Sequence, residues 1–293
     1  MNHRPECLPC CLRRVLHTAD RVTSDDWLRR RVVLDAMKEL SKVDDKATPA
    51  EVMYSVFRRA AKALGNADPY AEVKKRWMEE ALAAEDRIRS RIRSAEDPFL
   101  CALRLSIAAN AFDWELRQED HRPVTLKGLL DGADHLPLGL DNIDDFRSAV
   151  AQARSVLFVH KSSGELVFDR LLIEALGKPS SSVTCAVRSA PVLADATADD
   201  ARSAGLEKVA SVIDVGTDCL GVPLGACSEG FRAAYRSADL VLAKGQAAFQ
   251  TLEGKDSRID GREKQVYLLF RVKCALMART LGVAVGDGVL ERA

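Results

Sequence analysis

The chain has 293 residues, of which 47% are hydrophobic and 29% charged, and its 43 basic side chains balance 43 acidic ones. This is the composition of a globular protein large enough for one or two domains, and a balanced charge gives no reason to expect nucleic-acid binding. No apolar run reaches the roughly 18 residues of a membrane helix, and the opening MNHRPECLPCC lacks the apolar core of an export signal. We therefore expect a cytoplasmic protein without a membrane partner, and the composition does not indicate an oligomeric state.

Cysteines raise the first question of chemistry, because there are eight of them. A reducing cytoplasm keeps such thiols free, and Cys101, Cys185 and Cys274 lie in apolar segments where a thiol packs as a small hydrophobe. Cys7 and Cys10 differ, because their two-residue spacing can place two thiolates on one Zn²⁺ or Fe site. A closed site needs four ligands, so a metal site and a plain packing pair at a helix start both remain open.

The first half of the chain carries the helical period almost throughout. Within it, Thr48, Pro49 and Glu51 form the pattern of a helix start, with an N-cap, a proline at the first helical position and a capping-box carboxylate. Charged residues of both signs alternate on the faces that the apolar stripe leaves free, as on solvated helices. We predict an α-helical cap domain over residues 1–150.

One later helix of this half is unusually apolar and ends in the stretch AANAFD, which contains Asn110 and Asp113. The two polar residues are three positions apart and share one helix face. Buried polar side chains need hydrogen-bond partners. Two interpretations remain open: the side chains cap a neighbouring loop, or they bind a ligand.

The second half changes to short runs of Val, Ile and Leu that alternate with helix-like stretches, which is typical of βαβ units and a mostly parallel sheet. We therefore predict a Rossmann-like α/β domain over residues 151–293. Its expected strands are 156–159, 182–187, 209–215, 239–243 and 266–270.

The stretch from Ser155 to Gly177 contains a strand, a polar loop and a helix, and it is the first candidate for a functional site. In open α/β sheets, ligands bind beyond the carboxyl ends of the strands, where the following helix also offers free N–H groups. The polar loop residues that concern us are His160, Lys161, Ser162 and Glu165.

Polar residues also follow the next three expected strands. These residues are Arg188, Asp195, Asp218 and Lys244. Each could be a turn former or a helix cap, but their repetition favours a shared site. A guanidinium, an ammonium and carboxylates at neighbouring strand ends suit a phosphorylated or otherwise anionic ligand.

Eight motifs, in order along nearly the whole chain, resemble one family. They are CLPC at 7–10, GNADPY at 65–70, AANAFD at 108–113, GELVFDRLLIEAL at 164–176, VRSAPVLADAT at 187–197, DVGTDCLG at 214–221, ADLVLAKGQAAFQTL at 238–252 and VKC at 272–274. The family is the damage-control phosphatases with the acidic-residue-methyltransferase-like metal-binding domain, formerly a domain of unknown function. The resemblance implies a three-layer α/β/α sandwich with a helical N-terminal region. It also implies hydrolysis of small phosphometabolites with a divalent metal, such as Mn, Co, Ni or Mg, at the strand ends.

The resemblance further implies that an Asp-Asn pair and Asp195 hold the metal and that Lys244 meets the phosphate. This chain has Lys161 and Ser162 in place of the pair, and further departures at Ala194, Ala247, Ala248 and Gln250. Mg²⁺ and Mn²⁺ prefer hard oxygen ligands, whereas a protonated lysine offers no lone pair. Ordinary metal-dependent phosphatase activity is therefore expected to be impaired or altered.

Without the metal, the carboxylates of Asp195 and Asp218 are expected to pair with Lys161, Arg188 or Lys244, because pairing would neutralise them as the metal does. All five side chains would then lie at one cationic pocket.

Three functions follow from these residues. A divergent enzyme would act on an anionic metabolite, with Asp195 and Lys161 as catalytic groups and His160 as an acid or base. A non-catalytic binding or partner protein would keep the fold and lose the metal. The third possibility is an enzyme that uses a metal held by Cys7 and Cys10 for a different chemistry.

Overall fold

The computed structural model describes residues 1–114, 124–179, 182–253, 258–259 and 262–293. In this part of the chain seven strands form one twisted sheet in the order β1-β9-β8-β5-β2-β3-β4, and two short strands, β6 and β7, form a separate hairpin. Neighbouring strands of the sheet are parallel except for β8 and β9. The strands are β1 Leu138–Asp141, β2 Val156–Val159, β3 Val183–Val187, β4 Ser211–Asp214, β5 Leu240–Lys244, β6 Arg258–Ile259, β7 Arg262–Glu263, β8 Gln265–Arg271 and β9 Gly288–Arg292.

The mostly parallel α/β sheet confirms the predicted fold class, and all five predicted strands are present. Two strands of the seven-stranded sheet, β1 and β9, were not predicted, and neither were the hairpin strands β6 and β7. β1 is an edge strand of four residues in which half-buried and exposed positions alternate, so it lacks the continuous apolar run of a central parallel strand. Since β1 lies within residues 1–150, both halves of the chain contribute to the sheet. The division into a cap and an α/β domain stays a prediction.

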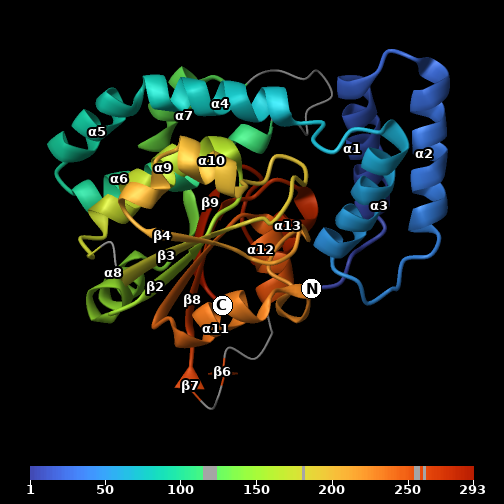
Figure 1. Cartoon of the computed structure of the whole chain (residues 1–293). Coiled ribbons are helices and arrows are strands. Elements are labelled where there is room, and N and C mark those ends of the chain that lie inside the picture. The colour runs from blue at the N-terminus through green and yellow to red at the C-terminus, as the bar shows by residue number, and fades with distance from the viewer. Residues whose placement is uncertain (115–123, 180–181, 254–257, 260–261) are drawn as a thin grey trace.

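Helices cover both faces of the sheet, which gives the three layers visible in Figure 1. One face packs against α4 to α9, and the other against α11, α12 and α13. None of the described helices has the length and apolar character of a membrane span. The helices are α1 Cys7–Val22, α2 Asp26–Leu40, α3 Pro49–Leu64, α4 Ala71–Ala83, α5 Glu85–Ser94, α6 Pro98–Ala109, α7 Leu126–Ala133, α8 Ile143–Gln152, α9 Leu166–Ala175, α10 Ala198–Ser203, α11 Glu229–Ser237, α12 Gln246–Leu252 and α13 Ala275–Leu281.

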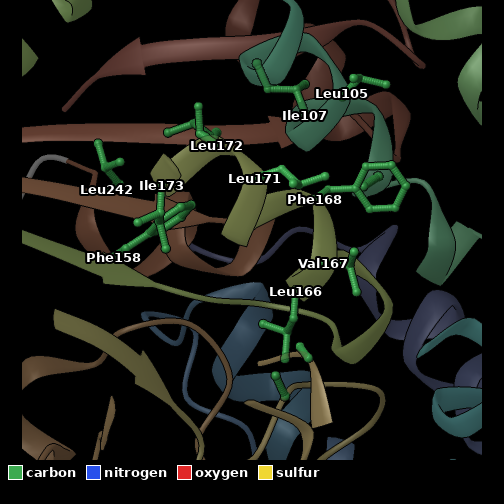
Figure 2. Packing of buried hydrophobic residues seen from close by; sticks show 14 of the residues in the cluster. Leu105, Ile107, Phe158, Leu166, Val167, Phe168, Leu171, Leu172, Ile173 and Leu242 are labelled. Carbon is green, nitrogen blue, oxygen red and sulfur yellow. The ribbon is translucent and has the colours of Figure 1, made fainter. Parts of the chain in front are cut away.

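The two cores follow from the alternation of side chains along each strand. In β2, Val156 and Phe158 face the layer of α4 to α9, while Leu157 and Val159 face α11 to α13. Figure 2 shows apolar side chains of α6 and α9 gathered over Phe158 and over Leu242 of β5. This double-sided burial explains why β2 is entirely apolar, and it makes the carboxyl end of β2 a rigid support.

Helices α1, α2 and α3 form a small bundle beside the sheet with a core of its own (Figure 1). The predicted capping box starts α3: Glu51 N donates to Thr48 Oγ1 at 3.2 Å, and Thr48 N donates to Glu51 Oε2 at 2.7 Å. The bundle contacts the α/β layers where α3 meets α12. It therefore stands next to the carboxyl ends of the central strands.

Candidate functional site at the strand ends

The loop after β2 is held against the segment that follows β3. Ala196 N donates to Lys161 O at 2.7 Å, Ser163 N donates to Ala194 O at 3.1 Å, and Ser162 forms an antiparallel bridge with Asp195. This backbone pairing makes the Lys161 loop and the Asp195 segment run side by side. It is the local reason why their side chains meet.

Three of the predicted site residues form what we call the strand-end charge cluster, which consists of Lys161, Arg188 and Asp195. Asp195 is fully buried and forms an ion pair with the Lys161 ammonium on one oxygen, while Arg188 Nε donates to its other oxygen at 3.0 Å. The predicted pairing of Asp195 with these two bases is therefore observed. Two cations and one carboxylate leave the cluster with a net positive charge.

The strand-end charge cluster also has unused hydrogen-bonding groups. Arg188 Nη1 and Ser162 Oγ are buried and have no hydrogen-bond partner among the residues that the structure describes. Buried polar groups are nearly always bonded, so such orphaned donors indicate that a water or ligand oxygen completes the structure. Ser162 stands where the resemblance implies an Asn metal ligand, and it lies directly beside Asp195.

Lys244 belongs to a second group, the inner ion-pair network. Its ammonium lies 3.0 Å from Asp169 Oδ1 and 3.0 Å from Glu165 Oε2, and it donates to Ser106 O at 2.5 Å and Ser106 Oγ at 2.9 Å. Lys244 is 1% exposed and does not line the cavity described below. Lys244 therefore contacts the loop after β2 through Glu165, while its side chain enters the layer between β5 and α6, where it pairs with Asp169.

Electrostatics keep this network ionised. Burial alone would raise the pKa of Asp169, but the charge of Lys244 and the hydrogen bond from His160 hold that pKa below its ordinary value. Burial would likewise lower the pKa of Lys244, but Asp169 and Glu165 raise it. The network is thus a set of mutually compensated buried charges.

His160 and Asn110 complete the inner ion-pair network. His160 Nδ1 lies 2.9 Å from Asp169 Oδ2, and its buried ring stacks on Phe158 with centroids 4.3 Å apart. Asn110 Nδ2 donates to Glu165 Oε1 at 2.9 Å, and its Oδ1 accepts from Arg271 N at 3.0 Å. Neither side chain lines the cavity. Asn110 thus holds neighbouring loops together. Both carboxylate oxygens of Glu165 face partners in the network, Asn110 and Lys244.

A cavity of about 170 Å³ opens between the helical bundle and the strand ends. Its cationic and acidic lining residues are Arg14, Lys161, Lys273 and Arg279, with Glu6 and Asp113. Its apolar lining residues are Pro49, Ala50, Met53, Leu193, Ala194, Leu220, Ala247, Ala275 and Leu276. Gln246 and Gln250 of α12 and four cysteines complete the wall. The cavity therefore joins the α1–α3 bundle to the end of the sheet that carries Lys161.

Lys273 is a cavity residue that the sequence analysis missed. It follows β8, forms a buried ion pair with Asp113, and donates its backbone N–H to Gln246 Oε1 at 3.2 Å. The rule that polar residues after strands mark the site would have found Lys273 if it had been applied to the fifth predicted strand as well. Of the two predicted residues from the helical part, Asp113 reaches the cavity and Asn110 does not.

Four thiols lie along the same cavity: those of Cys7, Cys10, Cys11 and Cys274. Burial raises the pKa of Cys7, and the nearby thiols of Cys274 and Cys10 add to this shift. The structure thus places Cys274 beside the CxxC motif. However, within the described ranges no three His, Cys, Asp or Glu side chains are grouped so that they could hold a metal ion.

Asp218 lies apart from the cluster and the cavity. Tyr54 Oη donates to its carboxylate at 2.6 Å, and Arg58 Nη1 lies 2.7 Å from it. The expected pairing of Asp218 with a strand-end base is therefore wrong. Its contacts connect the loop after β4 to α3, and so it helps to fix the bundle against the sheet.

A hard divalent metal does not fit the residues at the strand ends. Both oxygens of Asp195 already meet cationic donors, from Lys161 and Arg188. Lys161 brings a positive charge where a metal needs a lone pair, and Ser162 offers a single hydroxyl. The local chemistry suits an anion.

The comparisons with known proteins agree with this architecture over the full length. Residues 3–289 match the family described as Damage-control phosphatase ARMT1-like domain. A damage-control phosphatase of Pyrococcus horikoshii is 34% identical over 292 residues, covering 98% of this chain and 96% of that protein. A damage-control phosphatase of Archaeoglobus fulgidus is 31% identical over 298 residues, covering 99% of both. The crystal structure of a DUF89 family protein from Pyrococcus horikoshii superposes with a TM-score of 0.86 and 32% identity, covering 100% of this chain and 99% of that one.

Proposed function

Because the chain belongs to the damage-control phosphatase ARMT1-like family, we propose that it binds a small phosphorylated or otherwise anionic metabolite at its strand ends and that its metal-dependent hydrolysis is impaired. The single observation that carries this proposal is the strand-end charge cluster. In it, Lys161 pairs with Asp195 at the position where the resemblance implies a metal ligand.

The charge balance of the cluster supports an anionic partner. Two buried cations share one carboxylate, and a buried charge without a counter-charge is costly. Arg188 Nη1 and Ser162 Oγ can still donate hydrogen bonds. A phosphate or carboxylate group would supply both the missing negative charge and the missing acceptors.

The chemistry available to such a site consists of positioning and charge neutralisation. Lys161, which lines the cavity, would bind the anionic oxygens, and Asp195, which also pairs with Arg188, would orient it. His160 lies outside the cavity, so its acid or base role has no support from its position. These contacts serve an enzyme with altered chemistry and a non-catalytic binding protein equally well.

Calorimetry with inorganic phosphate, in buffer free of divalent metals, tests the proposal. We expect the wild-type protein to bind phosphate and Lys161→Met to lose at least about tenfold in affinity, since it loses one charge-assisted hydrogen bond. Lys75→Met is the matched control, because Lys75 is exposed on α4 and should leave the affinity unchanged. Equal binding by the wild type and Lys161→Met would reject the proposal.

An assay on a generic aryl phosphate with added Co²⁺, Ni²⁺ or Mn²⁺ separates the enzyme from the binding protein. We expect turnover far below that of a relative with Asp-Asn at the Lys161 and Ser162 positions. Robust metal-stimulated turnover would contradict the impaired metal site, even if phosphate binds as proposed.

A metal at the cysteines is the second proposal, and the placement of Cys274 beside Cys7 and Cys10 favours it. Zn²⁺ or Fe binds thiolates, whereas the raised pKa of Cys7 favours its neutral thiol. The thiols would also have to regroup, because the described residues contain no ready set of three ligands. For these two reasons we place this proposal second.

A further inference from the structure

We propose that the ligand is an amphiphilic anion, with one anionic head at Lys161 and a compact apolar body against the apolar side chains of the cavity, and that polyhydroxylated anions are disfavoured. This inference rests on the anion site proposed above and names the chemical class that the same cavity selects.

The apolar wall comes from elements on both sides of the cavity. Met53 of α3, Leu220 after β4 and Leu276 of α13 all line it, as does Leu193, the residue two positions before Asp195. Cys7 and Cys274 add thiols, which behave as small hydrophobic groups with weak hydrogen-bonding capacity. Burying an aliphatic or aromatic body against these side chains is favourable.

Several polar side chains of the cavity are paired with one another. Lys273 is paired with Asp113, and Glu6 with Arg279 at 2.5 Å. Gln246 uses both ends of its amide, since its Oε1 accepts from the Lys273 backbone and its Nε2 lies 3.5 Å from Cys274 Sγ.

A ligand with several hydroxyl groups would therefore meet few available partners beyond Gln250 and Lys161. Each hydroxyl that leaves water without a new hydrogen bond reduces affinity, whereas an aliphatic carbon at the same position gains from burial. The wall thus discriminates between two anions that carry the same head and differ only in their hydroxyl groups.

The volume of the cavity limits the body of the ligand. The cavity volume of about 170 Å³ is comparable with that of an engineered apolar cavity in another protein, which has about 150 Å³ and binds benzene. A body of about four to six carbon atoms attached to the head therefore fits within the cavity.

Two matched phosphonates test the proposal, because phosphonates resist hydrolysis. n-Butylphosphonate and 3,4-dihydroxybutylphosphonate have the same head and carbon chain, and inorganic phosphate reports on the head alone. In calorimetry we expect n-butylphosphonate to bind at least about tenfold more tightly than the dihydroxy compound. In Leu276→Gln and Met53→Gln, at half-buried positions, we expect this ratio to fall while the affinity for inorganic phosphate stays unchanged. Circular dichroism verifies that both variants fold.

The possible failures are distinguishable. If phosphate and both phosphonates bind but the two phosphonates bind equally, or the dihydroxy compound binds more tightly, the apolar selection is wrong and the anion site stands. An unchanged ratio in both folded variants would also overturn the selection by this wall. If neither phosphate nor either phosphonate binds, the anion site itself is wrong, and this inference falls with it.

Discussion

The inner ion-pair network and the strand-end charge cluster are built from the same kinds of residues at the ends of neighbouring strands, yet they differ in how completely their charges are satisfied. In the network, Lys244 meets two carboxylates and a serine, and its charge is fully compensated. In the cluster, the two cations Lys161 and Arg188 share the single carboxylate of Asp195, so positive charge is left in excess. The network therefore serves stability, and the cluster is free to serve binding.

This difference shows that a charged residue after a parallel strand has two possible fates. Lys244 turns into the protein, where every neighbour is fixed, whereas Lys161 turns toward the cavity. The two remain neighbours: Gly245 has a φ of 90°, and a Cβ atom there would lie 2.9 Å from Lys161 Cγ. The proposed ligand site and the network that supports the fold are therefore adjacent.

Removing the network lysine should produce the largest effect and so test the comparison most directly. Lys244→Met leaves Asp169 and Glu165 buried without their cation, and we expect a loss of about 3–5 kcal/mol in the free energy of unfolding. Lys161→Met is the matched variant, with an expected loss of about 1–3 kcal/mol, because Asp195 keeps Arg188. Urea unfolding measures both. Equal losses would remove the distinction between the two groups.

Restoring the Asp-Asn pair should sharpen the comparison by changing only the cluster. Lys161→Asp combined with Ser162→Asn replaces an ammonium and a hydroxyl by oxygen donors beside Asp195, so we expect Mn²⁺ affinity in calorimetry to rise at least about tenfold. The free energy of unfolding should change less than in Lys244→Met. Unchanged Mn²⁺ binding would mean that the other departures, including Ala194, also prevent metal binding.

Acid should weaken the network through Asp169, whose pKa lies below its ordinary value of 3.8. The ion pair stabilises the fold above that ordinary value, and this contribution is lost as the pH falls through the lower folded-state pKa. We therefore expect the difference in unfolding free energy between the wild type and Asp169→Asn to shrink below about pH 4. The pH dependence that arises from Lys244 has the opposite sign. Its pKa is raised, so its charge stabilises the fold fully at pH values below 10.5, and this stabilisation is lost as the pH rises through the folded-state pKa. A difference that is constant from pH 7 to the acid limit would show that Asp169 is not ionised in the fold.

The cysteines should give the smallest effect. Cys7→Ser with Cys10→Ser removes two thiols from the cavity wall, and treatment with a chelator removes any metal that they hold. From the raised pKa of Cys7 and the lack of a third grouped ligand within the described residues, we expect either treatment to shift the melting temperature by no more than a few degrees. Stoichiometric zinc or iron in the purified protein, lost together with much of the stability, would instead establish the cysteine metal site.

Sequence reasoning found the fold because the central strands are buried on both faces and therefore appear as uninterrupted apolar runs. It missed β1 and β9, since edge and antiparallel strands lack that signature. The family motifs added the three layers and the helical region. The helical period alone could not show that α1 would stand beside α13.

For the site, the sequence indicated which residues follow strands but not the layer into which each side chain points. Asp195 was correctly paired with Lys161 and Arg188, because backbone pairing after β2 and β3 brings them together. Asp218 was assigned the wrong partners, and the pairing of Lys244 with Asp169 was not predicted. The partners that decide their positions, such as Asp169 and Arg58, come from helices distant in sequence.

Residues of both α1 and α13 line the cavity, although these helices are synthesised at opposite ends of the chain. A chain emerging from the ribosome presents the CxxC motif long before β8 and Lys273, so the α1–α3 bundle can form its own core while the site still lacks half of its walls. Ligand binding can therefore stabilise only a protein whose sheet is already assembled. In a cell, abundant ligand would protect finished molecules from degradation and leave nascent ones unprotected.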